Sequence, residues 1–151
     1  MESPKDFPFA FSILIVEDSK AAGEALGRLI AMEFPGAKVI LAGDGREGLT
    51  FFKKHKPDLV ITDIYLRGMD GIQMLSEIKS VRSEVKIIVV TGYSEASHRH
   101  KVSQFDIEDY FLKPVQCELL YASIKRCFAQ FAGNGAGQLC QESLATPKIN
   151  C

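Results

Sequence analysis

Five short apolar runs alternate along the chain with segments of helical periodicity, and this alternation limits the fold more than any other feature. The runs are Phe11–Val16, Lys38–Ala42, Val60–Asp63, Val85–Thr91 and Asp109–Leu112. Short apolar runs bounded by turn signals are typical of strands buried on both faces. Because strict alternation of strand and helix favours a parallel sheet with right-handed crossovers, we predict an α/β fold. It is a doubly wound, five-stranded parallel sheet with helices on both faces.

Capping residues that precede the first four helical segments mark the helix starts; they are Ser19, Asp44, Asp70 and Ser94. Each can accept a hydrogen bond from the backbone of a first helical turn. The fourth helix is predicted to end near Phe105 and the closing helix near Phe131. The Gly-rich sequence that follows cannot offset its ordering entropy. We therefore predict a lead over residues 1–10, one domain over 11–131 and a flexible tail over 132–151, without room for an output domain.

The composition is that of an ordinary globular protein and argues against several kinds of partner. The chain has 151 residues, a hydrophobic content of 46% and a net charge of −1. It has no basic field for nucleic acid or membrane, no apolar run near the roughly 20 residues of a membrane span, and no secretory signal. The four cysteines lack metal-binding spacing, so we expect free thiols. These features predict a cytoplasmic protein that binds neither nucleic acid nor membrane directly.

Polar side chains gather where the predicted strands end: Glu17 and Asp18 after the first, Asp63 after the third, Thr91 after the fourth and Lys113 after the fifth. If these strands are neighbours, the side chains face one cleft at the carboxyl edge of the sheet. Three crowded carboxylates need a divalent cation or an ammonium group to neutralise them, and Mg²⁺ prefers such oxygen ligands. A lysine and a hydroxyl add donors for phosphoryl oxygens, and the remaining carboxylate can act as a nucleophile that forms an acyl phosphate.

Four motifs together resemble the receiver domain of two-component response regulators, in particular the stand-alone, chemotaxis-regulator-like kind. The motifs are Glu17-Asp18, Asp63 to Gly71, Thr91-Gly92 and Tyr110 to Pro114. The resemblance covers the chain from about Phe11 to Phe131 and fits the flavodoxin-like strand order 2-1-3-4-5. It implies that Asp63 accepts a phosphoryl group from a sensor histidine kinase or a histidine phosphotransfer protein.

The same resemblance implies a role for each site residue. Asp18, Asp63 and the backbone carbonyl of Tyr65 would bind Mg²⁺, with Glu17 assisting through water. Lys113 and the hydroxyl of Thr91 would contact the phosphoryl oxygens. The switch residues would be Thr91 and Tyr110, and the Lys113-Pro114 peptide bond would be cis.

Three residues depart from the family pattern. Arg67 stands where the family usually has Pro, so we expect a less rigid loop after Asp63, and Asp106-Ile107 replace the usual Gly-Ala.

Two residues after the acceptor, Tyr65 is a bulky ring at the mouth of the cleft. We expect it to shield the acyl phosphate from water.

These observations favour a phosphorylation switch that is not an enzyme, apart from an autophosphatase side activity. It would act by binding a protein target on the surface from the fourth helix through the fifth strand and helix; that surface includes Arg99, Lys101, Tyr110 and Lys125. The alternative is a phosphorelay intermediate that passes the group to a histidine phosphotransfer protein. A metal-dependent phosphohydrolase would carry a second Asp at the position of Tyr65. A flavodoxin-like carrier is disfavoured because the acidic first turn would repel a flavin phosphate.

Overall fold

The computed structural model describes residues 11–92 and 96–136 of the chain. By the density of its contacts the chain divides into two units, residues 1–115 and residues 116–151, and each is described by itself. The predicted lead over residues 1–10, the predicted cap Ser94 and the predicted tail beyond Ala136 lie outside the described residues. No helix in the described part of the chain is long and apolar enough to cross a membrane.

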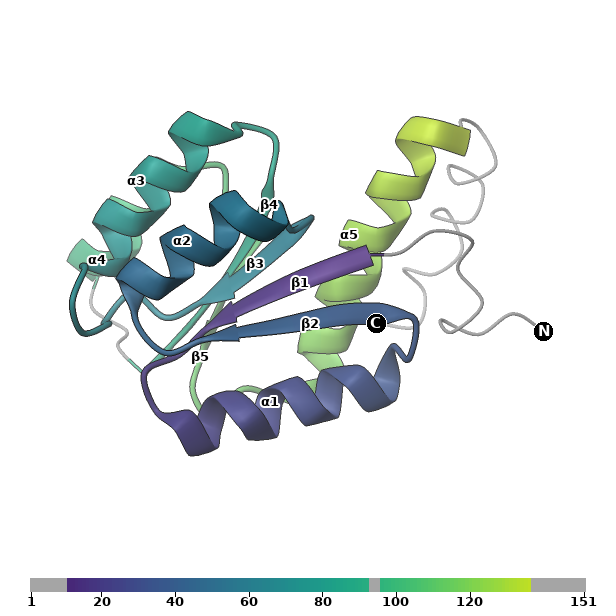
Figure 1. Ribbon diagram of the computed structural model, residues 1–151, viewed down its shortest axis with the longest axis horizontal. Helices are drawn as coiled ribbons and strands as arrows, with labels where there is room; N and C mark the ends of the chain where they lie inside the picture. The colour runs from purple at the N-terminus through teal and green to yellow at the C-terminus, as the bar shows by residue number, and fades with distance from the viewer. Residues whose placement is uncertain (1–10, 93–95, 137–151) are drawn as a thin grey trace. The chain divides into compact units, whose positions relative to one another are not determined.

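The first unit contains a five-stranded parallel sheet in the order β2-β1-β3-β4-β5 (Figure 1). The strands are β1 (Phe11–Val16), β2 (Ala37–Ala42), β3 (Leu59–Thr62), β4 (Lys86–Thr91) and β5 (Asp109–Leu112). The register aligns their carboxyl ends, because Val16 pairs with both Ala42 and Thr62, and Thr91 pairs with Leu112. The predicted parallel sheet and its strand order are confirmed.

Four helices of this unit are described: α1 (Lys20–Glu33), α2 (Gly45–His55), α3 (Gly71–Val81) and α4 (Ala96–Val102). Three begin at predicted caps. The side chains of Ser19, Asp44 and Asp70 each accept a hydrogen bond from the backbone of the first turn, at 3.2, 2.8 and 3.2 Å. The fourth helix ends at Val102 instead of near Phe105, because the amide of Phe105 turns back to the carbonyl of Val102.

Alternate residues of each strand point to opposite faces of the sheet, so each face needs a helical cover. On one face Leu14 and Val16 belong to a buried cluster with side chains of α2, α3 and α4. On the other face α1 approaches closely, and a methyl group added at Gly27 would meet Val39 and Leu41. Figure 1 shows α1 on the side of the sheet opposite α2 and α3. Full burial of each large apolar side chain contributes about 1.5–3 kcal/mol.

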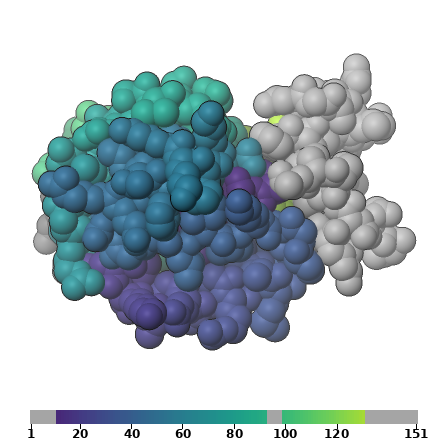
Figure 2. All heavy atoms as spheres, in the orientation of Figure 1, coloured from purple at the N-terminus to yellow at the C-terminus, as the bar shows by residue number. Residues whose placement is uncertain are grey.

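In the space-filling view, α1, β2, α2 and α3 form much of the visible face of this unit (Figure 2). Among the described residues other than glycine, Lys56, which caps the end of α2, has a positive φ of 49°. Asp106, which stands where the family usually has Gly, does not have a positive φ.

The second unit contains α5 (Cys117–Ala136). The predicted closing helix is present, but its backbone continues past Phe131 through Gly133 and Gly135. Each glycine inside a helix costs about 1 kcal/mol relative to Ala, which is why the sequence pattern placed the end earlier. Residues 132–136 thus form the last helical turn and not the start of a tail.

Candidate functional site

The carboxylate of Asp63, directly after β3, is held by the loop that follows it. The backbone amide of Asp63 donates to the carbonyl of Val16 at 3.3 Å, in line with the β1–β3 ladder. Its Oδ1 accepts hydrogen bonds from the amides of Ile64, at 2.6 Å, and Tyr65, at 3.1 Å. The residue is 8% exposed. Two backbone donors to one oxygen fix the orientation of the carboxylate.

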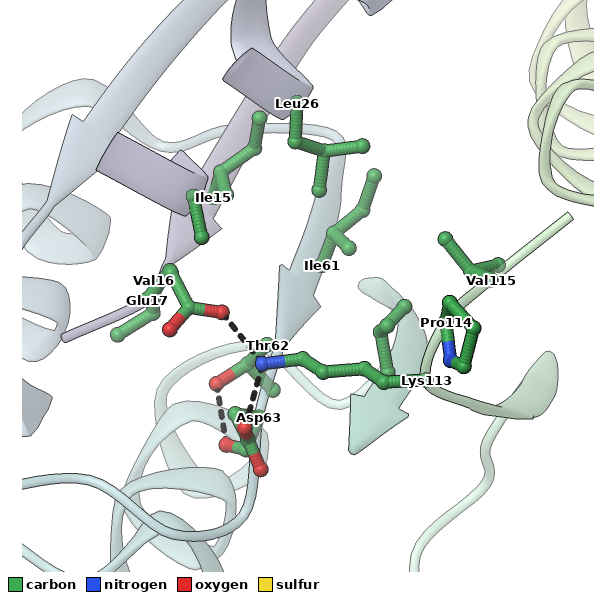
Figure 3. A pocket seen from close by; sticks show the side chains of 12 residues that line it. Ile15, Val16, Glu17, Leu26, Ile61, Thr62, Asp63, Lys113, Pro114 and Val115 are labelled. Carbon is green, nitrogen blue, oxygen red and sulfur yellow. Dashed lines mark hydrogen bonds and ion pairs between the residues drawn. The ribbon is translucent and has the colours of Figure 1, made fainter. Parts of the chain in front are cut away.

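Lys113, directly after β5, extends to two of the predicted acids (Figure 3). Its Nζ donates to Oδ2 of Asp63 at 3.0 Å and to Oε1 of Glu17 at 2.8 Å. The amide of Lys113 donates to the carbonyl of Thr91 at 2.8 Å, which continues the β4–β5 ladder up to the lysine. Parallel pairing therefore brings side chains 96 residues apart in sequence onto one ammonium group.

The protonation of Lys113 follows from this arrangement. Burial by itself lowers the pKa of its ammonium group, and this is the largest individual influence. The hydrogen bonds and negative charges of Glu17 and Asp63 together outweigh burial, so the pKa is raised above the usual 10.5. Lys113 is thus a cation at neutral pH.

Asp18 lies at the same edge but pairs with another cation. The guanidinium of Arg67 donates through Nη2 to the backbone carbonyl of Asp18 at 3.0 Å, and its Nε lies 3.8 Å from Oδ2 of Asp18. Glu17 faces Lys113, and its other oxygen accepts from the amide of Ser19 at 3.1 Å. From the sequence alone, Arg67 stands out only as a departure from a family pattern. The signal for its role was a long cationic side chain four residues after an acidic acceptor.

The loop that carries Arg67 is anchored through its backbone. The carbonyl of Arg67 accepts from the amides of Met69, at 3.0 Å, and Gly45, at 3.3 Å, at the start of α2. Gly68 has a φ of 81°, a conformation that glycine adopts without strain. The loop expected to be less rigid without Pro therefore has hydrogen bonds that hold its path.

The predicted switch residues Thr91 and Tyr110 lie on the adjacent strands β4 and β5. Thr91 is fully buried. The Tyr110 ring is stacked by Arg99 of α4, whose guanidinium carbon is 4.8 Å from the ring centroid. Burial raises the pKa of the Tyr110 hydroxyl, the charge of Arg99 opposes this rise, and Asp63 adds to it. The electrostatic influence of Asp63 thus extends to the predicted switch ring.

A cavity of about 430 Å³ opens beside Asp63. Its polar end is formed by Glu17, Asp63 and Lys113, and its other walls are mainly apolar, including Ile61 (Figure 3). The Lys113–Pro114 peptide bond on its rim is cis, as the resemblance implied.

The donors at this edge fit a hard divalent cation in kind. The carboxylate oxygens of Glu17, Asp18 and Asp63 are suitable ligands, and Mg²⁺ needs only one or two carboxylates because it keeps several waters. Among the side chains that the structure describes, no three from Asp, Glu, His or Cys are already grouped around a metal position. Lys113 and Arg67 occupy the carboxylates here, so a metal ion would compete with them.

Comparison with known proteins agrees with these features. The family model of the response regulator receiver domain matches residues 13–125. The response regulator MprA of Mycolicibacterium vanbaalenii is 32% identical over 127 residues, which are 83% of this chain and 54% of the relative. The probable C4-dicarboxylate response regulator DctR of Priestia megaterium is 29% identical over 78% of this chain and 51% of the relative. The chain thus spans about half the length of these curated relatives.

Solved structures with a similar fold point to the same family of proteins. The N-terminal domain of an uncharacterized protein from Wolinella succinogenes has a TM-score of 0.77 at 32% identity, covering 82% of this chain and 98% of that one. A complex of CheX and CheY with BeF3 and Mg²⁺ from Borrelia burgdorferi has a TM-score of 0.71 at 26% identity, covering 78% and 89%. With the matched family model, the parallel sheet and the acidic edge, these likenesses show that the chain belongs to the response regulator receiver domain family.

Proposed function

We propose that Asp63 accepts a phosphoryl group from a phosphohistidine in a Mg²⁺-dependent reaction, and that this event switches a partner-binding surface. The donor would be a sensor histidine kinase or a histidine phosphotransfer protein. The observation that carries the proposal is the Lys113 ammonium group, which bridges Asp63 and Glu17 at the carboxyl edge of the sheet. Such a site supplies a positioned nucleophile and a cation for the phosphoryl oxygens.

The reaction exchanges one phosphorus bond for another. A carboxylate oxygen of Asp63 attacks phosphorus, the bond from phosphorus to the imidazole nitrogen breaks, and its electron pair stays on the imidazole. When the other ring nitrogen of the phosphohistidine carries a proton, the products are an acyl phosphate on Asp63 and a neutral histidine on the donor. The amides of Ile64 and Tyr65 hold the carboxylate in position for attack. Lys113 offsets charge on the phosphoryl oxygens.

Asp18, Asp63 and the carbonyl of Tyr65 would hold the Mg²⁺ ion, with Glu17 assisting through water. Bound Mg²⁺ supplies charge neutralisation at the phosphoryl oxygens. The Borrelia neighbour, whose complex contains BeF3 and Mg²⁺, supports this part of the proposal by analogy. Autophosphatase activity would be the attack of water on the same acyl phosphate, which releases phosphate and restores the Asp63 carboxylate.

The output would begin at Thr91. A phosphoryl dianion on Asp63 attracts the Thr91 hydroxyl, and the Tyr110 ring then moves toward the space that the threonine leaves. The surface formed by α4 and β5, with Arg99, Lys101 and Tyr110, is our proposed target site. Phosphorylation of Asp63 would control binding in the same way whether the target is a separate protein or a further domain.

The test is incubation with Mg²⁺ and a small acyl-phosphate donor, followed by mass spectrometry of the intact protein. We expect the mass of one added phosphoryl group on the parent and none on Asp63→Asn. Asp70→Asn is the matched control, because Asn also caps helices well and leaves the acceptor intact. An unmodified parent, or an Asp63→Asn variant modified as well as the parent, would contradict the proposal.

A second arm distinguishes a terminal switch from a phosphorelay intermediate. The phosphorylated protein is mixed with a histidine phosphotransfer domain, and the label on each protein is followed. For a switch we expect the label to stay on Asp63 until hydrolysis. Rapid movement of the label to the histidine would favour the relay.

A further inference from the structure

We propose that Arg67 is a built-in counter-ion that Mg²⁺ must displace from Asp18, so that this side chain sets the Mg²⁺ concentration at which the site becomes ready. The inference rests on the proposed function, because it concerns the same Mg²⁺ site. It adds a residue that the family pattern does not supply: a Pro at this position has neither a charge nor a side-chain donor.

Arg67 contacts both parts of Asp18. Its Nη2 donates to the Asp18 backbone carbonyl at 3.0 Å, and its Nε lies 3.8 Å from the carboxylate oxygen Oδ2. The two residues are 49 positions apart in sequence and come from the loops after β1 and β3. The guanidinium therefore spans the mouth of the site from one loop to the other.

The three acids of the edge divide between two cations. Lys113 pairs with Glu17 and Asp63, whereas the ion pair of Asp18 is with Arg67. A carboxylate that already faces a cation gains less from a metal ion, because part of its charge is already compensated and the two cations repel each other. Metal entry at Asp18 therefore requires Arg67 to move away.

A metal ion can displace Arg67 more easily than Lys113, because the Arg67 side chain is more exposed. The Arg67 side chain is 76% exposed and that of Asp18 is 30% exposed, so solvent and salt weaken their attraction. Such a pair is worth up to about 1 kcal/mol, which is about a fivefold change in an equilibrium constant. The backbone bonds of the Arg67 carbonyl keep the loop in place when the side chain swings out.

The test is calorimetric titration of Mg²⁺ into the full, unphosphorylated chain at low and at high salt. We expect Arg67→Ala to bind Mg²⁺ about fivefold more tightly than the parent at low salt, with a smaller difference at high salt. Arg67→Gln keeps a donor for the Asp18 carbonyl but loses the charge, so it should resemble Arg67→Ala. Arg67→Lys keeps the charge and should resemble the parent.

The matched control is Arg46→Ala, which removes the same charge next to Gly45, the residue whose amide contacts the Arg67 loop. Its Mg²⁺ affinity should change by less than about twofold, because exposed charges without a direct contact are screened. Equal affinities for the parent, Arg67→Ala and Arg67→Gln would overturn the inference alone. Weaker binding by Arg67→Gln would also overturn it. Absence of Mg²⁺ binding in every protein would overturn both the inference and the proposed Mg²⁺-dependent function.

Discussion

Replacing Lys113 with Met removes the cation between Asp63 and Glu17 while keeping an unbranched side chain. Removing one partner of a buried ion pair lowers the free energy of unfolding by about 3–5 kcal/mol, whereas removing one partner of an exposed pair lowers it by about 0–1 kcal/mol. The Lys113 side chain is 35% exposed, while those of Asp63 and Glu17 are 9% and 12% exposed. We therefore expect the free energy of unfolding to fall by about 2 kcal/mol at neutral pH, between these limits.

Urea and thermal unfolding followed by circular dichroism would measure this loss. For a domain of this size, 2 kcal/mol corresponds to a fall in Tm of about 8 °C. The pKa of Lys113 is raised by folding, so its stabilisation is fully present below the usual pKa of 10.5 and is lost as the pH rises through the raised folded value. The stability difference between parent and Lys113→Met should thus be constant from pH 7 to about 9 and shrink above 10.5.

A double-mutant cycle separates the ion pair from the packing of the lysine stem. The double variant Lys113→Met and Asp63→Asn should lose less free energy of unfolding than the sum of the losses of the two single variants, because residues in contact are coupled. Lys53→Met, on the exposed face of α2, is the control and should change stability by less than about 0.5 kcal/mol. A Lys113→Met variant as stable as the parent, or a loss that does not change above pH 10.5, would refute the ammonium bridge.

Three further changes test other parts of the site. Gly71→Ala should lower the free energy of unfolding in urea by about 1–3 kcal/mol, because a Cβ there would overlap the backbone of Ile64, the residue after the acceptor. Gly92→Ala is the control and should be nearly neutral, because a Cβ there meets nothing within 4 Å. Equal losses of stability in the two variants would contradict this. Tyr65→Ala should lose its phosphoryl group several-fold faster; an unchanged half-life in the mass assay would remove the shielding role. Arg99→Gln should raise the pKa of Tyr110 in a spectrophotometric titration, because Arg99 lowers it; an unshifted value would argue against stacking.

The sheet could be predicted because it depends on short-range patterns. Each apolar run is short and ends at a turn signal, and strict alternation with helices leaves few topologies. The meeting of Asp63 and Lys113 followed from that topology, because parallel strands bring their carboxyl ends to one edge. The helix starts at Ser19, Asp44 and Asp70 were predictable for a similar reason, since a cap contacts its own first turn.

Contacts of long side chains across loops could not be predicted in the same way. The position of Arg67 opposite Asp18 depends on the path of the loop, which in turn depends on backbone bonds to the start of α2. The stacking of Arg99 on Tyr110 depends on where α4 ends and how it lies on β5. The extension of α5 to Ala136 runs against the low helix propensity of its glycines. In each case a tertiary or cooperative effect overrides the local pattern.

The charges of the site give its two cations different roles. Three carboxylates face Lys113 and Arg67, so the resting edge keeps an excess of one negative charge, which favours entry of a divalent cation. Loss of either cation increases that excess, and Mg²⁺ affinity should rise in both cases. Only the loss of Lys113 uncovers two largely buried carboxylates, so stability should fall there and remain within about 1 kcal/mol for Arg67→Ala. Parallel Mg²⁺ titration and urea unfolding of the two variants would reveal this difference, and equal stability losses would contradict it.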